Sequence, residues 1–413
     1  MIDPAAERAG HGPEAGAVWF DARGLQHGFK EHGGRGIGTY VGALAVALDG
    51  EAAPDRLRIL VERGADLLQS ITPARLLFAP RAVGRGRLAT QLHQHVQLAA
   101  WISARRPAAV HFPAQTDAPA LLGVRSIISV HDVVLHRHGS WYDGGTAGAP
   151  GSRAARARFR LMRLLERRAI AHAERIIVPS RATAEELART LHVPRAKITI
   201  IPLAAAARFT PSAAANDAAV RARLHLPGRY LLHTGGSDAR KRLPELIDVF
   251  AALAKDDPGL ALVLVGPVAS GDGHPAVRRA LDASGARQRI LLAGVLPEAD
   301  LPAVYRGAAA LVLATRHEGF GLPVVEAFAS GVPVVATAAD AVREVAGDAA
   351  LLVPVAEVGE LRAALRRVLD EPDLAAALRA RGLARAAQFR WSVAAAETLA
   401  VYEEVSGLRL RAA

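Results

Sequence analysis

Short apolar runs alternate with longer Ala-, Leu- and Arg-rich segments along most of the chain. Five runs lie in the first half, at 58–61, 108–112, 125–130, 175–180 and 198–203. Six lie in the second half, at 230–236, 260–266, 289–294, 309–315, 333–337 and 350–354. Continuous apolar runs separated by helix-length segments indicate parallel strands that are buried on both faces. The pattern therefore predicts an α/β fold with two doubly wound parallel sheets.

A break in this pattern predicts where one domain ends and the next begins. The chain has 413 residues, which is long for one hydrophobic core, so we expect two domains. The stretch 201–220 leaves a strand and continues with small residues and prolines before the periodicity resumes. We place an N-terminal domain at 1–205 and a C-terminal domain at 206–390. The Gly-, Ser- and Pro-rich stretch 139–152 predicts a long surface loop.

Composition narrows the class of protein. Hydrophobic residues make up 51% and charged residues 22%, which is typical of a globular protein with a large core. There is no cysteine, which excludes disulfides, a thiolate nucleophile and cysteine-bound metal. No basic n-region with an apolar h-region opens the chain, and no uninterrupted apolar stretch reaches about 18 residues, so we expect a cytoplasmic protein without a transmembrane helix. The net charge of +11 fits nucleic acid, an anionic membrane surface, phosphorylated substrates or no partner at all.

The stretch 316–326, "RHEGFGLPVVE", carries two glutamates on either side of a glycine turn. Pro323 suits the start of a helix, which would put Glu326 in the first turn, where the helix dipole stabilises a carboxylate. The dipole leaves Glu318 unexplained. Gly319 and Gly321 let the backbone approach a ligand, and two carboxylates can accept hydrogen bonds from paired hydroxyls. The arrangement favours a site for a sugar or ribose with its phosphate.

A second strand end, "HTGGSDARKR", leads through Gly235 and Gly236 to a basic pair. Arg240 and Lys241 stand where a cationic clamp on a diphosphate would be needed. A basic pair that enters a helix is also typical of a solvated face. The preceding glycines, directly after a strand, favour the clamp.

The first half of the chain offers weaker signals. Gly36 and Gly38 form a G-x-G that enters a helix, but Val41 stands where the dinucleotide fingerprint requires a third glycine. His131 and Asp132 directly follow a strand, a position that faces the ligand crevice in this architecture. A capping or loop histidine is the structural alternative for His131.

Two further patterns have open interpretations. Histidines at 131, 136 and 138 lack the helical spacing and glutamate of a metal motif, so no metal is expected. Arginines at 153, 156, 160, 163 and 167 share one helix face, with Phe159, Met162 and Leu164 or Leu165 turned elsewhere. Such a stripe fits a solvated face, anionic lipid or a pyrophosphate-bearing acceptor.

Together these stretches resemble the retaining glycosyltransferases of family 4, which have the GT-B fold, and within it bacterial mannosyltransferases. The resemblance is carried by "GRGIGTY", "HD", "VPS", "GFGLPVVEAFASGVPVVAT" and the closing "FRWSVAAAETLAVYEEV". Its most specific part is the E-x7-E spacing from Glu318 to Glu326. It implies two Rossmann-like domains, the first binding the acceptor and the second the nucleotide sugar, with a C-terminal helix at about 391–413 returning to the first.

The resemblance also implies roles for individual residues. Glu326 would bind the ribose hydroxyls and Glu318 the transferred sugar, while Arg240 and Lys241 would hold the diphosphate and His131 would lie near the anomeric carbon. Backbone contacts to the donor would come from the glycine turns and from the segment beside the base, at Gly36, Gly38, Gly235, Gly236, Val295, Leu296, Gly319, Phe320, Gly321 and Leu322. Many relatives carry an arginine five residues before the clamp lysine; this chain has Gly236 there, and Arg240 would replace it.

The expected reaction is transfer of a hexose, with mannose from GDP-mannose as the first choice, to a lipid-linked or polysaccharide acceptor of cell-surface glycan synthesis. No D-x-D motif occurs, so no metal or other cofactor is expected. We expect contact with a nucleotide sugar, a glycan acceptor and the inner face of an anionic membrane. Two alternatives are a GT-B nucleotide-sugar epimerase and a basic, non-enzymatic nucleic-acid-binding protein. The sequence holds no nucleic-acid-binding module, so we expect no nucleic acid partner.

Overall fold

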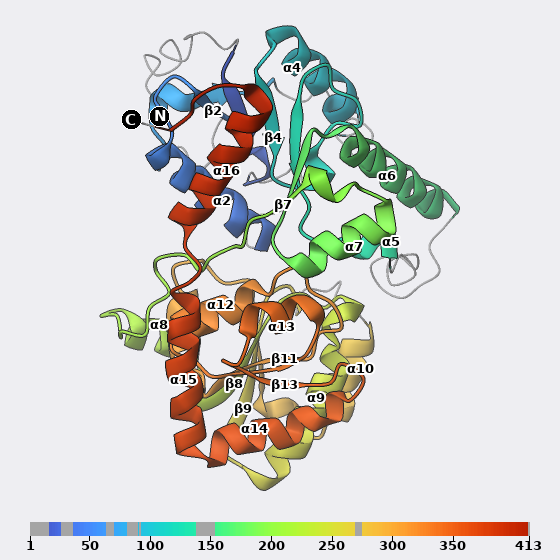
Figure 1. The fold of residues 1–413 in the computed structure, drawn as a ribbon. Coiled ribbons are helices and arrows are strands. Elements are labelled where there is room, and N and C mark those ends of the chain that lie inside the picture. The colour runs from blue at the N-terminus through green and yellow to red at the C-terminus, as the bar shows by residue number, and fades with distance from the viewer. Residues whose placement is uncertain are drawn as a thin grey trace. The chain divides into compact units, whose positions relative to one another are not determined.

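The computed structural model describes residues 16–25, 36–62, 70–80, 90, 92–137, 153–268 and 275–411, and within these the side chains of 154 and 155 are not described. The predicted loop at 139–152 and His138 lie outside the described residues. The chain divides into two compact units (Figure 1). Unit 1 comprises Met1–His136, Ala157–Leu203 and Trp391–Ala413, and unit 2 comprises Arg137–Arg156 and Ala204–Arg390.

Unit 1 is built on a seven-stranded parallel sheet in the order β3-β2-β1-β4-β5-β6-β7. Its strands are β1 Val18–Asp21, β2 Leu57–Val61, β3 Leu76–Phe78, β4 Ala109–Phe112, β5 Ser126–Ser129, β6 Arg175–Val178 and β7 Ile198–Ile200. β1, β2, β4 and β5 are buried along their whole length, as strands covered by helices on both faces must be.

Seven α- or π-helices are described in this part of the chain. They are α2 Gly36–Glu51, the π-helical η4 His93–Leu98, α4 Ala99–Arg105, α5 Val134–Arg137, α6 Arg153–His172, α7 Arg181–Leu191 and α16 Trp391–Ser406. Ser180 caps α7, since its side chain accepts a hydrogen bond from the Thr183 amide at 3.1 Å. Figure 1 shows α16, in red, alongside α2, in blue, so the C-terminal helix completes unit 1.

Unit 2 repeats the same plan with a six-stranded parallel sheet in the order β10-β9-β8-β11-β12-β13. The strands are β8 Arg229–Thr234, β9 Leu260–Val265, β10 Ile290–Gly294, β11 Ala310–Leu313, β12 Val334–Thr337 and β13 Leu351–Val353. The helices are α8 Asp217–Arg223, α9 Leu243–Asp256, α10 Pro275–Ala283, α11 Leu301–Arg306, α12 Leu322–Ala329, α13 Asp340–Ala346, α14 Leu361–Asp370 and α15 Pro372–Ala386.

The strand order of each sheet reverses at one point, between β1 and β4 in unit 1 and between β8 and β11 in unit 2. Connections on either side of such a point leave in opposite directions, which opens a crevice beyond the carboxyl ends of the two strands. The chain leaves β8 towards Gly235 and leaves β11 towards Glu318. The topology therefore brings the two predicted sites of unit 2 to the same edge.

The predicted fold class is confirmed, and each of the eleven predicted apolar runs overlaps a strand of the structure. Two strands, β1 and β3, were not predicted. β1 has only four residues, "VWFD", of which one is β-branched, yet it is an interior strand of its sheet, between β2 and β4. Other four-residue strands were predicted, so length is not the reason; β1 combines a single β-branched residue with two aromatic ones and ends at Asp21.

Gly266 follows β9 in a conformation that other residues rarely adopt. Its φ is +125°, and a Cβ added at this position would lie 2.2 Å from the carbonyl oxygen of Gly235. The neighbouring backbone is fixed, because the Gly235 amide bonds to the Val265 carbonyl and the Gly266 amide to the Gly294 carbonyl. The ends of β8, β9 and β10 can approach this closely only because Gly266 has no side chain.

We therefore predict that Gly266→Ala destabilises unit 2 by at least about 1–3 kcal/mol, the range typical of a strained backbone conformation. Chemical denaturation followed by circular dichroism would measure the loss. The matched control is Gly228→Ala, because a Cβ added at Gly228 would meet no atom within 4 Å and this residue is not in the left-handed region. Equal stability of the two variants would contradict the prediction.

Candidate functional site

The loops that follow β8 and β11 are joined through the backbone of Arg240. The Arg316 amide donates a hydrogen bond to the Arg240 carbonyl at 2.7 Å, and the Thr315 hydroxyl donates to the same oxygen at 3.3 Å. Arg240 and Lys241 lie in a short 3-10 turn, Ala239–Lys241, and not in the helix that we expected them to enter, since α9 begins at Leu243. The turn brings the basic pair to the glutamate loop.

Lys241 and Glu318 form a buried ion pair across these loops. The Lys241 Nζ donates to the Glu318 Oε1 at 2.5 Å, and the two side chains are only 8% and 9% exposed. Burial alone would raise the pKa of Glu318, but the charges of Lys241 and Arg240 lower it to about 2. Burial and the charge of Lys241 also lower the pKa of the neighbouring His233 to about 4. At neutral pH the pair is therefore ionised, beside a neutral imidazole.

Glu326 lies deeper in its helix than the sequence suggested. Gly321 adopts φ +102° and caps α12, which begins at Leu322, so that Glu326 is the fifth residue of the helix and no acidic residue occupies the first turn. The expected stabilisation by the helix dipole is therefore wrong. The side chain instead receives a hydrogen bond from the Tyr305 hydroxyl at 2.6 Å, and that hydroxyl lies 3.0 Å from the hydroxyl of Thr234.

The surroundings of Glu326 oppose its ionisation. Burial raises the pKa of this carboxyl to about 7, although the Tyr305 hydrogen bond and the charge of Arg208 lower it, while Glu298 raises it further. Arg208 and Glu298 are themselves paired at 2.5 Å. The pKa values of Glu318 and Glu326 are thus shifted in opposite directions. Glu318 is ionised through most of the pH range, and Glu326 changes charge near neutral pH.

The other predicted donor contacts of unit 2 lie on the same two loops, at the start of α12 or directly after β10. Gly235 has φ +147°, and a Cβ added there would lie 3.4 Å from Cε of Lys241, so the backbone runs close to the clamp. Phe320 is buried and meets Phe389 edge-on at 5.7 Å. The Arg240 guanidinium bonds to Asp238 at 3.0 Å. The rest are Gly236, Gly319 and Leu322, together with the exposed Val295 and the buried Leu296 after β10.

His131 of unit 1 has a fixed ring orientation. Its Nε2 lies 2.7 Å from the Pro113 carbonyl, which can only accept, so Nε2 carries the proton. The His131 amide donates to the side chain of Gln115, whose amide nitrogen in turn donates to the Asp132 carbonyl. The ring of Tyr40 meets the imidazole edge-on at 4.7 Å. Gln115 therefore fixes the backbone of the predicted "HD" pair, while Pro113 and Tyr40 fix the ring.

A buried polar network continues from Tyr40 into unit 1. The Tyr40 hydroxyl lies 2.7 Å from that of Ser129, which lies 2.8 Å from Nε2 of His111. Nδ1 of His111 lies 2.6 Å from the hydroxyl of Tyr402. Burial lowers the pKa of His111 to about 3, so the ring is neutral. The network joins α2, which begins with the predicted Gly36 and Gly38, to β4, β5 and α16.

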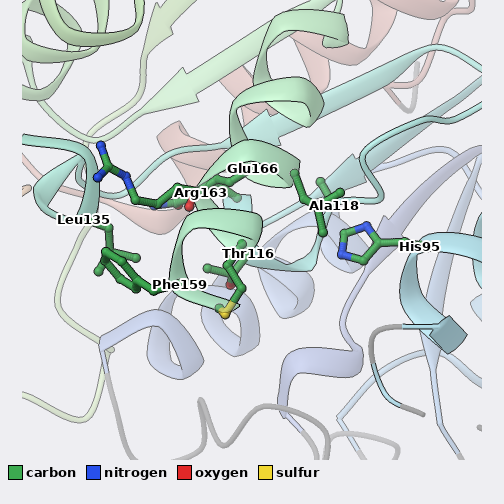
Figure 2. Close-up of a pocket in the computed structure, with 10 residues that line it drawn as sticks. His95, Thr116, Ala118, Leu135, Phe159, Arg163 and Glu166 are labelled. Carbon is green, nitrogen blue, oxygen red and sulfur yellow. The ribbon is translucent and has the colours of Figure 1, made fainter. Parts of the chain in front are cut away.

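Unit 1 also contains a pocket, which lies between α5, α6 and the turn after β4 (Figure 2). Glu166, which is 7% exposed, lies 3.3 Å from the imidazole of His136. In the described parts of the chain, no three His, Cys, Asp or Glu side chains gather as a potential metal site. Gln115 connects this pocket to His131, because it lines the pocket and also bonds to the "HD" backbone. Other lining residues are His95, Thr116, Leu135, Phe159, Arg163 and Glu166.

The predicted arginine stripe on α6 differs from the structure at one position. Arg163 is half-buried and donates to the His136 carbonyl at 3.1 Å, so it does not belong to the outer face. Leu161 and Leu164 are 54% and 53% exposed on this helix, and Met162 is 38% exposed. The exposed arginines are at 153, 156, 158, 160, 167 and 168. None of the described helices is both long and apolar enough to span a bilayer.

The sequence interpretation did not include several residues that hold the site together. Tyr305 and Thr234 contact Glu326 directly or through one hydroxyl, and Gln115 holds the backbone of His131. Tyr305 lies in "LPAVYRGAAA", where a tyrosine at helical spacing is indistinguishable from a core residue. Thr234 immediately precedes Gly235 at the end of a predicted strand, and this position is the feature of the sequence that could have indicated a role in the site.

Comparison with known proteins identifies the family of the chain. Residues 34–205 match the family model described as "Glycosyltransferase Family 4", and residues 221–385 match "Glycosyl transferases group 1". The chain belongs to these glycosyltransferases, and its two parallel-sheet domains are those of the GT-B fold.

Individual relatives match parts or all of the chain. O-antigen chain mannosyltransferase B of Escherichia coli is 30% identical over 234 residues, which are 56% of this chain and 61% of that protein. Sucrose-phosphate synthase of Thermosynechococcus elongatus superposes with a TM-score of 0.70 at 20% identity, over 95% of this chain and 99% of the other. HepE of Anabaena, solved with UDP and glucose, gives 0.69 at 18% identity over 95% and 99%. At these identities the two structures show the fold alone.

The raised pKa of Glu326 predicts how stability depends on pH. A folded-state pKa of about 7 lies above the ordinary value of 4.5, so the stabilisation is complete below pH 4.5 and is lost as pH rises through about 7. Glu326→Gln cannot titrate. Relative to this variant, the unmodified protein should lose up to about 3 kcal/mol of stability between pH 4.5 and 8. Urea denaturation across this pH range would measure the difference in free energy of unfolding. Substitution of the exposed Glu371 by Gln is the control. Parallel curves of unfolding free energy against pH for Glu326→Gln and the unmodified protein would contradict the prediction.

Proposed function

We propose that the protein transfers a hexose from a nucleoside diphosphate sugar to a glycan or lipid-linked acceptor, with retention of anomeric configuration. The observation that carries the proposal is the group formed by Lys241, Glu318 and Glu326 at one edge of the unit 2 sheet. A lysine suits a diphosphate, and two carboxylates suit the paired hydroxyls of a sugar and a ribose. No other set of described residues in unit 2 combines these chemistries at a strand-order reversal.

The Lys241–Glu318 pair supports a specific order of events. The lysine ammonium already lies in the site, neutralised by a carboxylate that it can exchange for the donor diphosphate. Once the diphosphate binds Lys241, the Glu318 carboxylate becomes available to the hydroxyls of the transferred sugar. Arg240 adds positive charge on the same turn, and Glu326 takes the ribose hydroxyls. Backbone amides at 319–322 and at Val295 and Leu296 complete the donor contacts.

The chemistry follows from this placement of charge. The bond between the anomeric carbon and the diphosphate oxygen breaks, and an acceptor oxygen forms its bond on the same face of the sugar. The acceptor proton passes to the departing phosphate oxygen, and Lys241 and Arg240 stabilise the negative charge that develops there. Cationic side chains are sufficient for this role, so we propose that no metal is required. His131 of unit 1 has its ring held by the Pro113 carbonyl.

Mannose is our first choice of sugar. The matched relative is named an O-antigen chain mannosyltransferase, which also supports a polysaccharide or lipid-linked acceptor. HepE, with UDP and glucose bound, makes UDP-glucose the competing donor. The pocket beside Gln115 is our candidate for an acceptor group, because Gln115 also bonds to the "HD" backbone.

A donor screen tests the proposal. At least one of GDP, UDP and ADP at saturating concentration should raise the melting temperature. The matching nucleotide sugar should be turned over, and Lys241→Met should weaken nucleotide binding. Glu318→Gln frees Lys241 from its partner, so nucleotide affinity should stay equal or rise by up to about tenfold, while turnover falls by about 100-fold.

The alternatives give different results in the same screen. An epimerase would convert the donor sugar without transferring it. A nucleic-acid-binding protein would show no stabilisation by any nucleotide and would bind nucleic acid with a steep salt dependence. Weaker nucleotide binding by Glu318→Gln would contradict the proposed exchange of partners at Lys241.

We further propose that the outer face of α6 contacts an anionic membrane surface. Exposed leucines lie among exposed arginines on this helix, a combination that suits the boundary between lipid headgroups and acyl chains. An acceptor with a lipid anchor would be reached at the same surface.

Vesicle binding tests the membrane contact. The protein should sediment with phosphatidylglycerol vesicles and much less with phosphatidylcholine, and Leu161→Gln with Leu164→Gln should reduce binding by about tenfold or more. Leu121→Gln is the matched control, because Leu121 is 58% exposed but lies away from α6 in the sequence. Equal binding of both vesicle types, or an unchanged double variant, would contradict the proposal.

A further inference from the structure

A chain of three buried polar groups ends at Glu326. The Tyr305 hydroxyl lies 2.6 Å from Oε2 of Glu326 and 3.0 Å from the Thr234 hydroxyl. Tyr305 is fully buried, and Thr234 and Glu326 are each 8% exposed. The three residues come from α11, β8 and α12 and are far apart in the sequence.

The hydrogen bonds of this chain have a defined direction when Glu326 is ionised. A carboxylate can only accept, so the single proton of the Tyr305 hydroxyl goes to Glu326. The Tyr305 oxygen is then an acceptor, and Thr234 must be the donor to it. The tyrosine therefore holds Oε2 of Glu326, and the carboxylate has further lone pairs that can accept from a ligand.

We propose that Tyr305, oriented by Thr234, is a positioning residue that holds the Glu326 carboxylate for the ribose hydroxyls and thereby sets the pH range of donor binding. The inference rests on the proposed function, in which Glu326 binds the ribose. Tyr305 does not touch the donor in this scheme and acts through Glu326.

The ring of Tyr305 is packed against an aromatic neighbour, and a second buried tyrosine provides a comparison. Its ring meets Phe209 edge-on, with ring centroids 5.4 Å apart and planes at 88°. A second buried tyrosine in the same unit, Tyr230, donates to the Val304 carbonyl at 2.6 Å and makes no bond to Glu326. Tyr230 is thus a matched comparison: it has the same buried hydroxyl but a backbone partner.

Other charged groups around Glu326 also affect its ionisation. Arg208, from the segment before α8, favours the carboxylate, and Glu298, from the loop after β10, disfavours it. Against these and the burial of the side chain, the tyrosine hydrogen bond favours the ionised form, and the pKa is about 7. Ribose hydroxyls donate more strongly to a carboxylate than to a neutral acid, so donor affinity should rise with pH through about 7. Removal of the tyrosine hydroxyl should move this midpoint to higher pH.

The experiment compares nucleotide affinity across pH in matched variants. The nucleoside diphosphate that most stabilises the unmodified protein, GDP, UDP or ADP, is titrated calorimetrically between pH 5.5 and 9 into the unmodified protein, Tyr305→Phe, Thr234→Val and Tyr230→Phe. Affinities are taken as ratios to the unmodified protein at each pH, which removes the titration of the nucleotide itself. Circular dichroism confirms that each variant is folded.

We expect Tyr305→Phe to bind about three- to fivefold more weakly at pH 7 and to recover to within about twofold at pH 9, as a midpoint shifted by up to about one pH unit requires. Thr234→Val should shift the midpoint in the same direction by a smaller amount, and Tyr230→Phe should not shift it. If Tyr305→Phe does not fold, the Thr234→Val and Tyr230→Phe comparison decides the question.

Two outcomes would overturn the inference. If Tyr305→Phe lost the same factor of nucleotide affinity at every pH, Tyr305 would have a structural role only. If Thr234→Val left the pH midpoint of nucleotide binding unchanged, Thr234 would not act through Tyr305. Failure of the unmodified protein to bind any of the three nucleotides would instead overturn the proposed function, and the inference with it.

Discussion

The parallel arrangement of every strand in both sheets is the constraint on which the rest of this structure depends. In a parallel sheet all carboxyl ends lie at one edge, and strands covered by helices on both faces leave little room for polar groups elsewhere. Lys241 accordingly lies after β8 and Glu318 after β11, where the strand order reverses. Lys241, Glu318, Glu326 and Thr234 are neighbours for this reason, although 92 residues separate the first and last along the chain.

Burial gives these few groups their chemical character. An exposed lysine and glutamate at 2.5 Å would be screened by water, whereas the Lys241–Glu318 pair is almost completely enclosed and is strongly ionised. The same burial acts against Glu326, which has a tyrosine hydroxyl as its partner in place of a cation. Two glutamates of identical chemistry, eight residues apart, therefore differ in charge near neutral pH because one is paired with an ammonium and the other with a phenol.

Much of the fold could be predicted from the sequence because buried parallel strands have a clear signature. The eleven apolar runs and the placement of Glu318 and Lys241 at strand ends follow from local pattern alone. β1 was not found in this way, since its four residues include one β-branched and two aromatic side chains and end at Asp21. The start of α12 at Leu322 depends on the φ of Gly321, and the glycine alone does not specify it.

The partners of the predicted residues were harder to predict than the residues themselves. Tyr305 and Gln115 are recognised only through contacts with Glu326 and His131, which arise from the tertiary fold. Pairing of Lys241 with Glu318 likewise depends on the backbone link between Arg316 and Arg240. A single sequence contains no periodicity that connects these positions. The side chains of Tyr305, Gln115 and Thr234, a phenol, an amide and a hydroxyl, are also common in ordinary cores and loops.

The buried contact between His111 and Tyr402 has a consequence for biosynthesis. Unit 1 contains both the first and the last described segments of the chain, and unit 2 is inserted between them. Because synthesis runs from the N-terminus, β4 with His111 is made 291 residues before the tyrosine that bonds to its Nδ1. Unit 2 can therefore finish folding while the sheet made first still lacks a helix. The N-terminal unit is begun first and is completed last.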